Sequence, residues 1–202
     1  MSIKAVIFDM GGVLVRTEDR APRAALGLRF GKSYNELEQI VFANKSSGRA
    51  SRGEIGAREH MLYVMRTLNL PETDEAIDNF VDEFFLGDEV DREMINYIQS
   101  LRPRYKTVML SNAWNNLRKV LVNRWKIAPA FDEIFISAEM GLAKPDPKIF
   151  EMVLTKLGVA PEECVFVDDF IQNIEAARKL GMHAIHFQDV DVVIGELRKF
   201  LG

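Results

Sequence analysis

The chain has 202 residues, of which 48% are apolar and 28% are charged, and its formal net charge is −4. This length suits one main domain with a modest insertion, and the composition allows a sizeable hydrophobic core. A net negative chain lacks the basic face of a general nucleic-acid-binding protein. The apolar run before Asp9 is too short for a signal peptide or a membrane span. With Cys164 as the only cysteine, no intramolecular disulfide is expected, and we predict a cytoplasmic protein that binds neither nucleic acid nor membrane.

Five short apolar segments are predicted to be strands of a parallel sheet, because strands covered on both faces are apolar almost throughout. They are residues 3–8, 107–110, 133–136, 164–167 and 184–187. Helical patterns lie between the later strands, at residues 114–124, 147–157 and 170–180. Gly158 and Gly181 follow the last two patterns, where a left-handed helix C-cap is expected. The alternation predicts an α/β fold with a Rossmann-like, doubly wound parallel sheet.

The long segment between the first two predicted strands shows only helical patterns. Its apolar residues repeat at helical spacing in three groups: Leu37, Ile40 and Val41; Met61, Leu62, Met65 and Leu68; and Ala76, Ile77, Phe80, Val81, Phe84 and Phe85. A fourth group, Met94, Ile98 and Leu101, leads back to the sheet. We therefore predict a core domain of residues 1–15 and 88–202, interrupted by an all-helical cap domain of residues 16–87.

Polar side chains follow four of the predicted strands, at the carboxyl ends where parallel α/β sheets bind their ligands. In chain order these side chains are Asp9, Ser111, Asn112, Lys144, Asp168, Asp169 and Asn173. If the four strands belong to one sheet, carboxylates, a hydroxyl, amides and an ammonium converge on one crevice.

Such a set suits phosphoryl transfer. Carboxylates from two strands can hold a hard divalent cation through oxygen ligands. Lys144 and that cation would neutralise phosphoryl oxygens and depress the pKa of Asp9, which would stay an ionised nucleophile. Ser111, and the backbone or side-chain amide of Asn112, can donate hydrogen bonds to a phosphate oxygen. The two glycines after Asp9 let the backbone approach a ligand closely.

Together these motifs resemble the haloacid dehalogenase superfamily, in the branch with a helical cap inserted after the first strand. The motifs occur in the family's order: Val6-Ile7-Phe8-Asp9, Leu110-Ser111-Asn112, Lys144-Pro145-Asp146-Pro147, and Phe166-Val167-Asp168-Asp169 with Asn173. The run from Ser111 to Trp114 and the pair Asp168-Asp169 are similar to the phosphatase domain of soluble epoxide hydrolase and to bacterial sugar-phosphate phosphatases.

The resemblance implies a Mg²⁺-dependent phosphatase that acts on a small phosphorylated metabolite through an aspartyl-phosphate intermediate on Asp9. It implies that Mg²⁺ is held by Asp9, the backbone carbonyl of Gly11 and Asp169. Lys144 would act in catalysis and bind the phosphate together with Ser111 and Asn112, while Asp168 and Asn173 would support these groups from behind. Asp168 is expected to face Lys144.

One position departs from the pattern of the family's phosphatases, which usually carry a second Asp two residues after the nucleophile. Gly11 stands at that position. No side chain there can protonate the leaving group, and acid–base help is typically worth ~10²–10⁴-fold in rate. Glu18 and Glu54 are the nearest candidates for another proton donor.

Plainer interpretations exist for each motif. The first aspartate could cap a turn, the Ser-Asn pair could start a helix, the lysine could be solvated in a loop, and the Asp pair could lie at a helix N-terminus.

Two rival functions are considered beside the phosphatase. One is a catalytically idle protein of this fold that binds a phosphate ligand or a partner, which Gly11 favours; the other is a haloacid dehalogenase, which the Asp pair disfavours because two acids suit a cation.

A basic segment in the predicted cap, residues 45–58, carries four basic side chains and a single acid, Glu54. Its ordinary interpretation is a solvated surface. The alternative is that Arg49 or Arg52 leans over the site and helps to select an anionic substrate.

Overall fold

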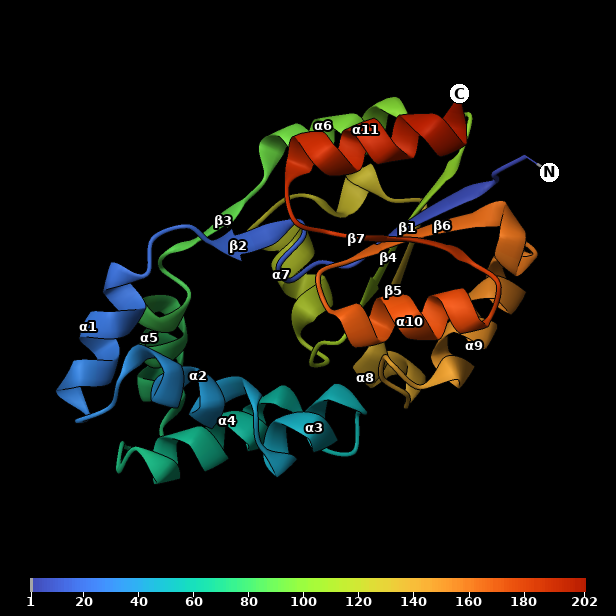
Figure 1. Cartoon of the computed structure of the whole chain (residues 1–202). Coiled ribbons are helices and arrows are strands. Elements are labelled where there is room, and N and C mark those ends of the chain that lie inside the picture. Colours follow the sequence, from blue (N-terminus) through green and yellow to red (C-terminus); the bar gives the residue numbers. More distant parts are fainter. Residues whose placement is uncertain (1) are drawn as a thin grey trace.

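The computed structural model describes residues 2–202, which form an α/β core with a helical cap beside it (Figure 1). The core is a five-stranded sheet in the order β5-β4-β1-β6-β7, and every neighbouring pair is parallel. Its strands are β1 (Ala5–Phe8), β4 (Lys106–Ser111), β5 (Glu133–Ile136), β6 (Cys164–Asp168) and β7 (His183–His186). All five predicted strands are confirmed within one or two residues at each end, and so is the Rossmann-like fold.

Helices cover both faces of the sheet (Figure 1). One face packs against α6 (Arg92–Ser100), α7 (Leu117–Asn123) and α11 (Val190–Leu201), and the other against α9 (Pro147–Leu157) and α10 (Ile171–Lys179). Side chains of β1 alternate between these layers, with Val6 and Phe8 in one and Ala5 and Ile7 in the other. A short helix, α8 (Ser137–Met140), follows β5. The helix expected over residues 114–124 begins only at Leu117, because the preceding residues form a loop at the edge of the sheet.

The cap consists of five helices with a hydrophobic cluster of their own. They are α1 (Ala21–Arg29), α2 (Tyr34–Phe42), α3 (Lys45–Ser51), α4 (Ala57–Thr67) and α5 (Asp74–Phe84). Ser33 and Glu36 form a capping box at the start of α2, and Thr73 caps α5, so side chains satisfy the free N–H groups there. The all-helical insertion is confirmed, and the exact domain boundaries stay a prediction.

A small antiparallel ribbon joins the cap to the core. Its strands are β2 (Val15–Thr17), through which the chain leaves the core, and β3 (Asp88–Val90), through which it returns. Thr17 Oγ1 donates a hydrogen bond to Asp88 Oδ1 at 2.7 Å. This ribbon is not predicted from the sequence, because three-residue strands carry too little pattern to be recognised.

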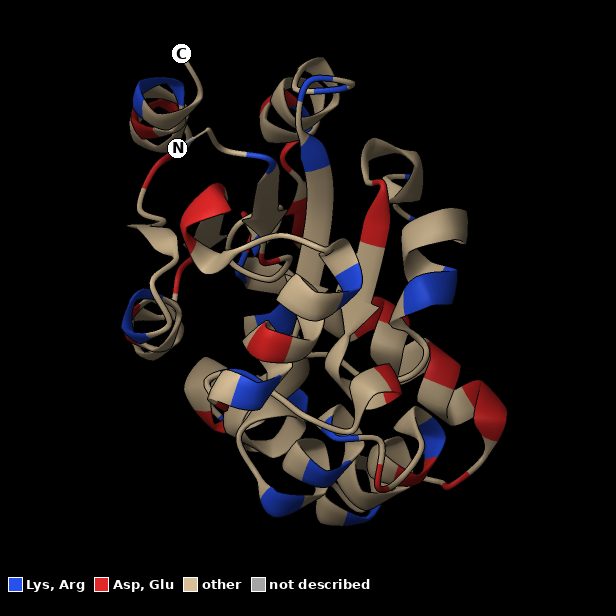
Figure 2. Ribbon diagram, turned by 90° about the vertical axis from the view of Figure 1, so that its right-hand side faces the viewer, with Lys and Arg blue, Asp and Glu red and all other residues tan. Residues whose placement is uncertain are grey.

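Basic and acidic residues are both spread over the ribbon diagram, and neither sign covers it alone (Figure 2), in keeping with the slightly negative net charge. Within residues 2–202, none of the helices combines the length and the apolarity that a membrane crossing requires.

Candidate active site

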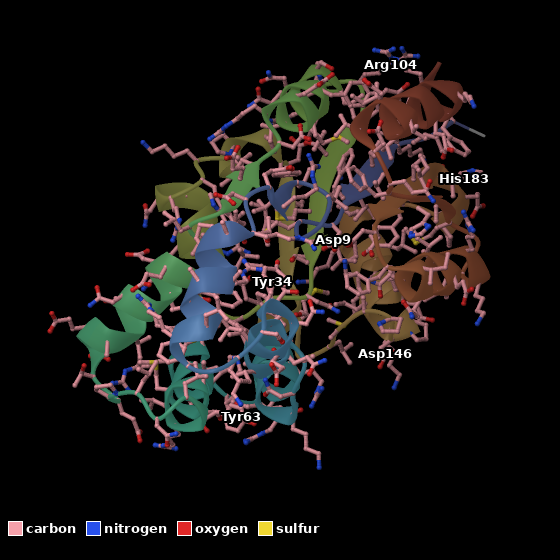
Figure 3. The ribbon with its side chains drawn as sticks, turned by 60° about the vertical axis from the view of Figure 1, so that its left-hand side comes forward. Asp9, Tyr34, Tyr63, Arg104, Asp146 and His183 are labelled. Atoms are coloured by element: carbon pink, nitrogen blue, oxygen red, sulfur yellow. The ribbon has the colours of Figure 1, made fainter. Side chains whose placement is uncertain are left out.

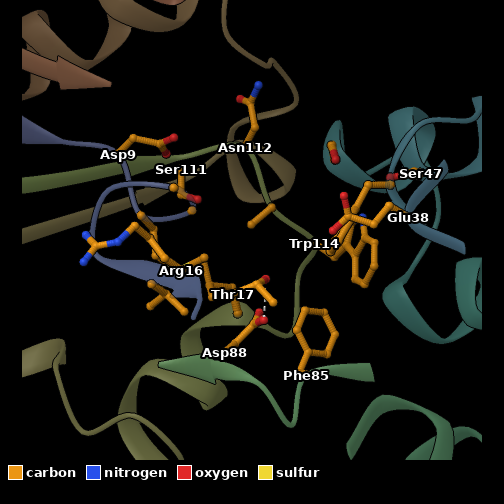
Figure 4. A pocket seen from close by; sticks show the side chains of 18 of the residues that line it. Asp9, Arg16, Thr17, Glu38, Ser47, Phe85, Asp88, Ser111, Asn112 and Trp114 are labelled. Carbon is orange, nitrogen blue, oxygen red and sulfur yellow. Dashed lines mark hydrogen bonds between the residues drawn. The ribbon is translucent and has the colours of Figure 1, made fainter. Parts of the chain in front are cut away.

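A cleft of about 1300 Å³ lies between the carboxyl edge of the sheet and the cap. Figure 3 shows Asp9 between the sheet and the cap helix that carries Tyr34, and both residues line the cleft. Figure 4 shows Asp9 and Ser111 together on the core side of the cleft. The parallel register brings these groups to one level, since Phe8 pairs with Met109 on one side and with Val167 on the other. The cleft therefore lies where ligands bind in parallel α/β sheets.

Lys144 links two carboxylates at the base of the cleft. Its Nζ lies 2.9 Å from Asp9 Oδ1 and 2.6 Å from Asp168 Oδ2. All three side chains are buried, with Asp9 only 7% and Lys144 only 4% exposed. The ammonium therefore compensates two negative charges that would be costly to bury alone.

Burial and the neighbouring charges shift the pKa values of Asp9 and Lys144. Desolvation raises the pKa of Asp9 to about 6, because the attraction of Lys144 offsets it only partly and Asp168 adds repulsion. Burial lowers the pKa of Lys144, but the two carboxylates outweigh it and the net shift is upward. Lys144 alone therefore does not depress the pKa of Asp9, because one lysine cannot overcome the desolvation of a buried carboxylate. The expected depression by Lys144 together with a cation stays a prediction.

Hydrogen bonds from α10 and the residue before it fix the carboxylate of Asp168. Asn173 Nδ2 donates to both of its carboxylate oxygens at 3.0 Å, and the Phe170 N–H donates to Oδ1 at 2.8 Å. With Lys144 on Oδ2, every oxygen of Asp168 already has donors. The contacts orient Asp168 towards Lys144 and leave it poorly suited to hold a ligand of its own.

The side chain of Asn112 contacts the loop that carries Lys144. Its Nδ2 donates to the Lys144 carbonyl at 2.7 Å, and its Oδ1 accepts from the Lys144 N–H at 2.8 Å. This pair of bonds fixes the lysine backbone across the cleft floor. The side-chain amide of Asn112 is therefore engaged in positioning Lys144, and its backbone N–H remains available as a phosphate donor beside Ser111.

Asp169 carries the one buried side-chain atom in residues 2–202 that lacks a hydrogen-bond partner, its Oδ1. Burial also raises the pKa of this carboxyl to about 6. One ligand atom each from Asp9, Asp168 and Asp169 lies within 4.8 Å of the others. Buried polar atoms are nearly always paired, and carboxylate oxygens are the ligands of hard divalent cations, so the residues present fit such an ion.

The two glycines after Asp9 differ in their surroundings. A Cβ on Gly12 would lie 2.1 Å from Asp169 Oδ2, and Gly12 has φ of +76°, which favours glycine. A Cβ on Gly11 would meet nothing within 4 Å, and its φ lies outside the left-handed region. Gly12 thus makes room for Asp169, whereas Gly11 leaves an opening beside the nucleophile.

Arg49 and Arg52 both pair with Glu54, at 3.5 and 2.7 Å. Arg52 lines a shallow pocket beside Asn112 and Lys144, and Arg49 is absent from the lining of either pocket. Of the suggested proton donors, Glu18 lines the main cleft and Glu54 does not.

Four further cationic side chains line the cleft that the sequence motifs do not predict: Arg16, Arg20, Arg23 and Arg124. Only their place in the fold identifies them, because they come from the ribbon, from the start of the cap and from the end of α7. In the sequence they look like ordinary surface arginines.

A family model described as haloacid dehalogenase-like hydrolase matches residues 3–181. The chain belongs to this family. The hydrolase is similar to the D-ribitol-5-phosphate phosphatase of Bacteroides thetaiotaomicron, with 30% identity over 89% of each chain. It is also similar to a sesquiterpene phosphatase of Aspergillus oryzae, with 28% identity over 100% of this chain and 98% of the other.

Among solved structures, the hydrolase shares its fold with a haloacid dehalogenase family enzyme from Bacteroides thetaiotaomicron, in complex with magnesium and inorganic phosphate. That likeness has a TM-score of 0.78 at 23% identity and covers 95% of this chain and 99% of the other.

Proposed function

We propose that this hydrolase is a Mg²⁺-dependent phosphatase that acts on a small phosphorylated metabolite. The observation that carries the proposal is the partnerless buried oxygen of Asp169 beside the Asp9–Lys144 ion pair, at the open edge of the sheet. The phosphatases among its relatives and the magnesium and phosphate in the similar solved structure support it. Asp9, Asp169 and the carbonyl of Gly11 would hold Mg²⁺, which would supply positive charge to the phosphoryl oxygens.

In the proposed reaction, a carboxylate oxygen of Asp9 attacks phosphorus while the bond to the ester oxygen breaks. Lys144 stabilises the negative charge on the phosphoryl oxygens, and the Ser111 hydroxyl and the Asn112 N–H orient the group. The leaving oxygen keeps the electron pair and takes a proton from water. Water then attacks the phosphorus of the aspartyl-phosphate, which releases inorganic phosphate and restores Asp9.

Phosphate release from a panel of sugar, acyl, nucleotide and aryl phosphates tests the proposal. We expect release with added Mg²⁺ and its loss with a chelator. Equal release in both conditions would overturn the assignment of the cation. No release from any ester, with phosphate binding retained, would favour the idle binding protein that Gly11 allows. A haloacid dehalogenase is not supported, because an unpaired Asp169 would repel an anionic haloacid.

Replacing Gly12 by alanine is expected to weaken Mg²⁺ binding about 10- to 100-fold, because the new methyl group must displace the Asp169 carboxylate. Isothermal titration with Mg²⁺ measures this directly. Gly31→Ala is the matched control, since Gly31 also has positive φ, +64°, but has open space around it. Both variants should lose about 1–2 kcal/mol of stability from the backbone conformation alone. Unchanged Mg²⁺ affinity in Gly12→Ala would remove Asp169 from the metal site.

Replacing Gly11 by aspartate is expected to accelerate the hydrolysis of alkyl phosphates, with a ceiling near ~10²–10⁴-fold, because it supplies a proton donor for a poor leaving group. The open space and ordinary φ at Gly11 predict a stable variant, which a melting curve checks. Aryl phosphates should gain much less, since a phenolate leaves without a proton. An equal gain for both ester classes would show that the missing acid does not limit the wild-type enzyme.

A further inference from the structure

Three aromatic side chains form one side of the cleft, here called the aromatic wall: Phe42 at the end of α2, Phe85 just after α5, and Trp114 in the loop after β4. The rings of Phe42 and Trp114 are stacked, with centroids 6.0 Å apart, and the edge of Phe85 meets Phe42 at 6.0 Å. Phe42 remains 45% exposed although its ring also meets the buried ring of Phe84, with centroids 5.5 Å apart. The three side chains thus contribute apolar surface to the cleft.

The short sequence distance between Trp114 and Ser111 keeps the aromatic wall close to the proposed phosphate-binding loop. Trp114 follows Ser111 by only three residues, so the loop that binds phosphate in the proposed function continues directly into the wall. Figure 4 shows Trp114 and Phe85 on the cap side of the cleft, across from Asp9 and Ser111. A phosphate ester held at Asp9 therefore has room to extend its leaving group towards the wall.

Two of the four arginines that line the cleft, Arg23 and Arg124, lie next to Phe85 and are paired within the protein. Arg23 donates to the Phe84 carbonyl at 3.0 Å and to Asp88 at 2.7 Å, and it also pairs with Glu38. Arg124 donates to Asp82 at 3.1 Å. A polyol would have to compete with these bonds to reach Arg23 or Arg124, whereas an aromatic ring needs only the exposed faces of the wall.

The acids on this side are engaged in the same way. Glu18 accepts from Arg16, and Asp88 accepts from both Arg23 and Thr17. Glu38 accepts from Arg23 and Tyr34. The remaining acids of the described lining are Asp9, the proposed nucleophile, and Asp169, a proposed Mg²⁺ ligand. With open space at Gly11, no further side-chain acid is left to protonate a departing alkoxide.

Given the proposed phosphatase activity, we infer that the leaving-group subsite is the aromatic wall and that the preferred substrates are phosphate monoesters of phenolic alcohols. The aromatic ring of the substrate lies against Phe42, Phe85 and Trp114. When the bond between phosphorus and the ester oxygen breaks, the electron pair stays on the phenolate, which later takes its proton from water.

Four compounds separate the parts of this inference: phenyl, benzyl, 2-hydroxyethyl and acetyl phosphate. Benzyl and 2-hydroxyethyl phosphate both release alkoxides, so their ratio of kcat/KM reports the ring, and we expect about 10-fold or more in favour of benzyl, mainly through KM. Phenyl and benzyl phosphate both carry the ring, so a higher kcat for phenyl phosphate reports the leaving group. Acetyl phosphate has a good leaving group and no ring, and it tests the proposed function by itself.

Variants of Phe42 test the wall. Phe42→Ala should reduce the benzyl preference about 3- to 10-fold while acetyl phosphate hydrolysis is kept, and Phe42→Tyr should retain the preference. Leu28→Ala is the matched control, because Leu28 is an exposed apolar residue of the cap, 74% exposed, that does not line the cleft.

The outcomes are distinguishable. Mg²⁺-dependent acetyl phosphate hydrolysis with equal rates for benzyl and 2-hydroxyethyl phosphate would overturn the inference and leave the proposed function standing. So would a preference for polyol phosphates, or a benzyl preference that Phe42→Ala leaves intact. Failure to hydrolyse acetyl phosphate as well as the three esters would overturn both. The wild-type substrate series decides the matter even if a Phe42 variant fails to fold.

Discussion

Replacing Asp9 by asparagine is expected to lower phosphate release by at least about 10⁴-fold and to leave the protein folded. The amide has nearly the same shape as the carboxylate but cannot form the phosphorylated intermediate. Initial rates on the best substrate of the panel measure the loss, and labelling with beryllofluoride, one equivalent in the wild type and none in the variant, identifies the residue. Asp78→Asn, an exposed aspartate of α5, is the control. Activity within about 10-fold of the wild type would exclude Asp9 as the nucleophile.

The pH dependence of the melting temperature provides a second test on the Asp9→Asn variant. The pKa of Asp9 is raised by burial from 3.8 to about 6, so the folded protein binds this proton more tightly than the unfolded chain. The contribution of Asp9 to stability is therefore fully present below about pH 4 and is lost as the pH rises through about 6. Without Mg²⁺, melting temperatures should show a smaller decline from pH 4 to 7 in Asp9→Asn than in the wild type. An identical decline would contradict this assignment.

Replacing Lys144 by methionine is expected to abolish detectable turnover and to destabilise the protein by about 3–5 kcal/mol. The variant leaves Asp9 and Asp168 facing each other in a buried site without the ammonium that lies 2.9 and 2.6 Å from them. Thermal melting without Mg²⁺ should show a drop on the order of 10 °C for a chain of this size.

The control for this variant is Lys148→Met, an exposed lysine at the start of α9 in the same region of the chain. It should melt within about 2 °C of the wild type, since surface substitutions rarely exceed 0.5 kcal/mol. A Lys144→Met variant that melts like the wild type would mean that the carboxylates are compensated in another way, and full activity would remove Lys144 from phosphate binding.

The core and the positions of the candidate residues could be predicted from the sequence because they depend on local pattern. The apolar runs that end at Phe8 and Val167 are buried throughout, and each is followed at once by a candidate residue, Asp9 and Asp168. The helical cap was visible where apolar spacing was strong, as in α4 and α5. Helix α3 was not, because its residues, KSSGRAS, carry no apolar stripe and are started by the Asn44 cap.

Only the tertiary structure decided what each candidate contacts. Asn112 engages the backbone of Lys144, 32 residues away, and Arg23 joins α1 to Glu38 and Asp88. The aromatic wall assembles Phe42, Phe85 and Trp114 from distant segments. Local patterns do not specify such contacts, because they arise only when the cap and the core pack together.

The sequence by itself determined that the chain builds a parallel α/β sheet with a helical cap, and that carboxylates and a lysine gather at the carboxyl edge of that sheet. It could not determine their electrostatics. Without a cation, the pKa of Asp9 lies above its usual value although Lys144 is paired with it, and Asp169 has a partnerless oxygen. The reason is that desolvation depends on everything packed around a group, and this surrounding exists only in the folded protein.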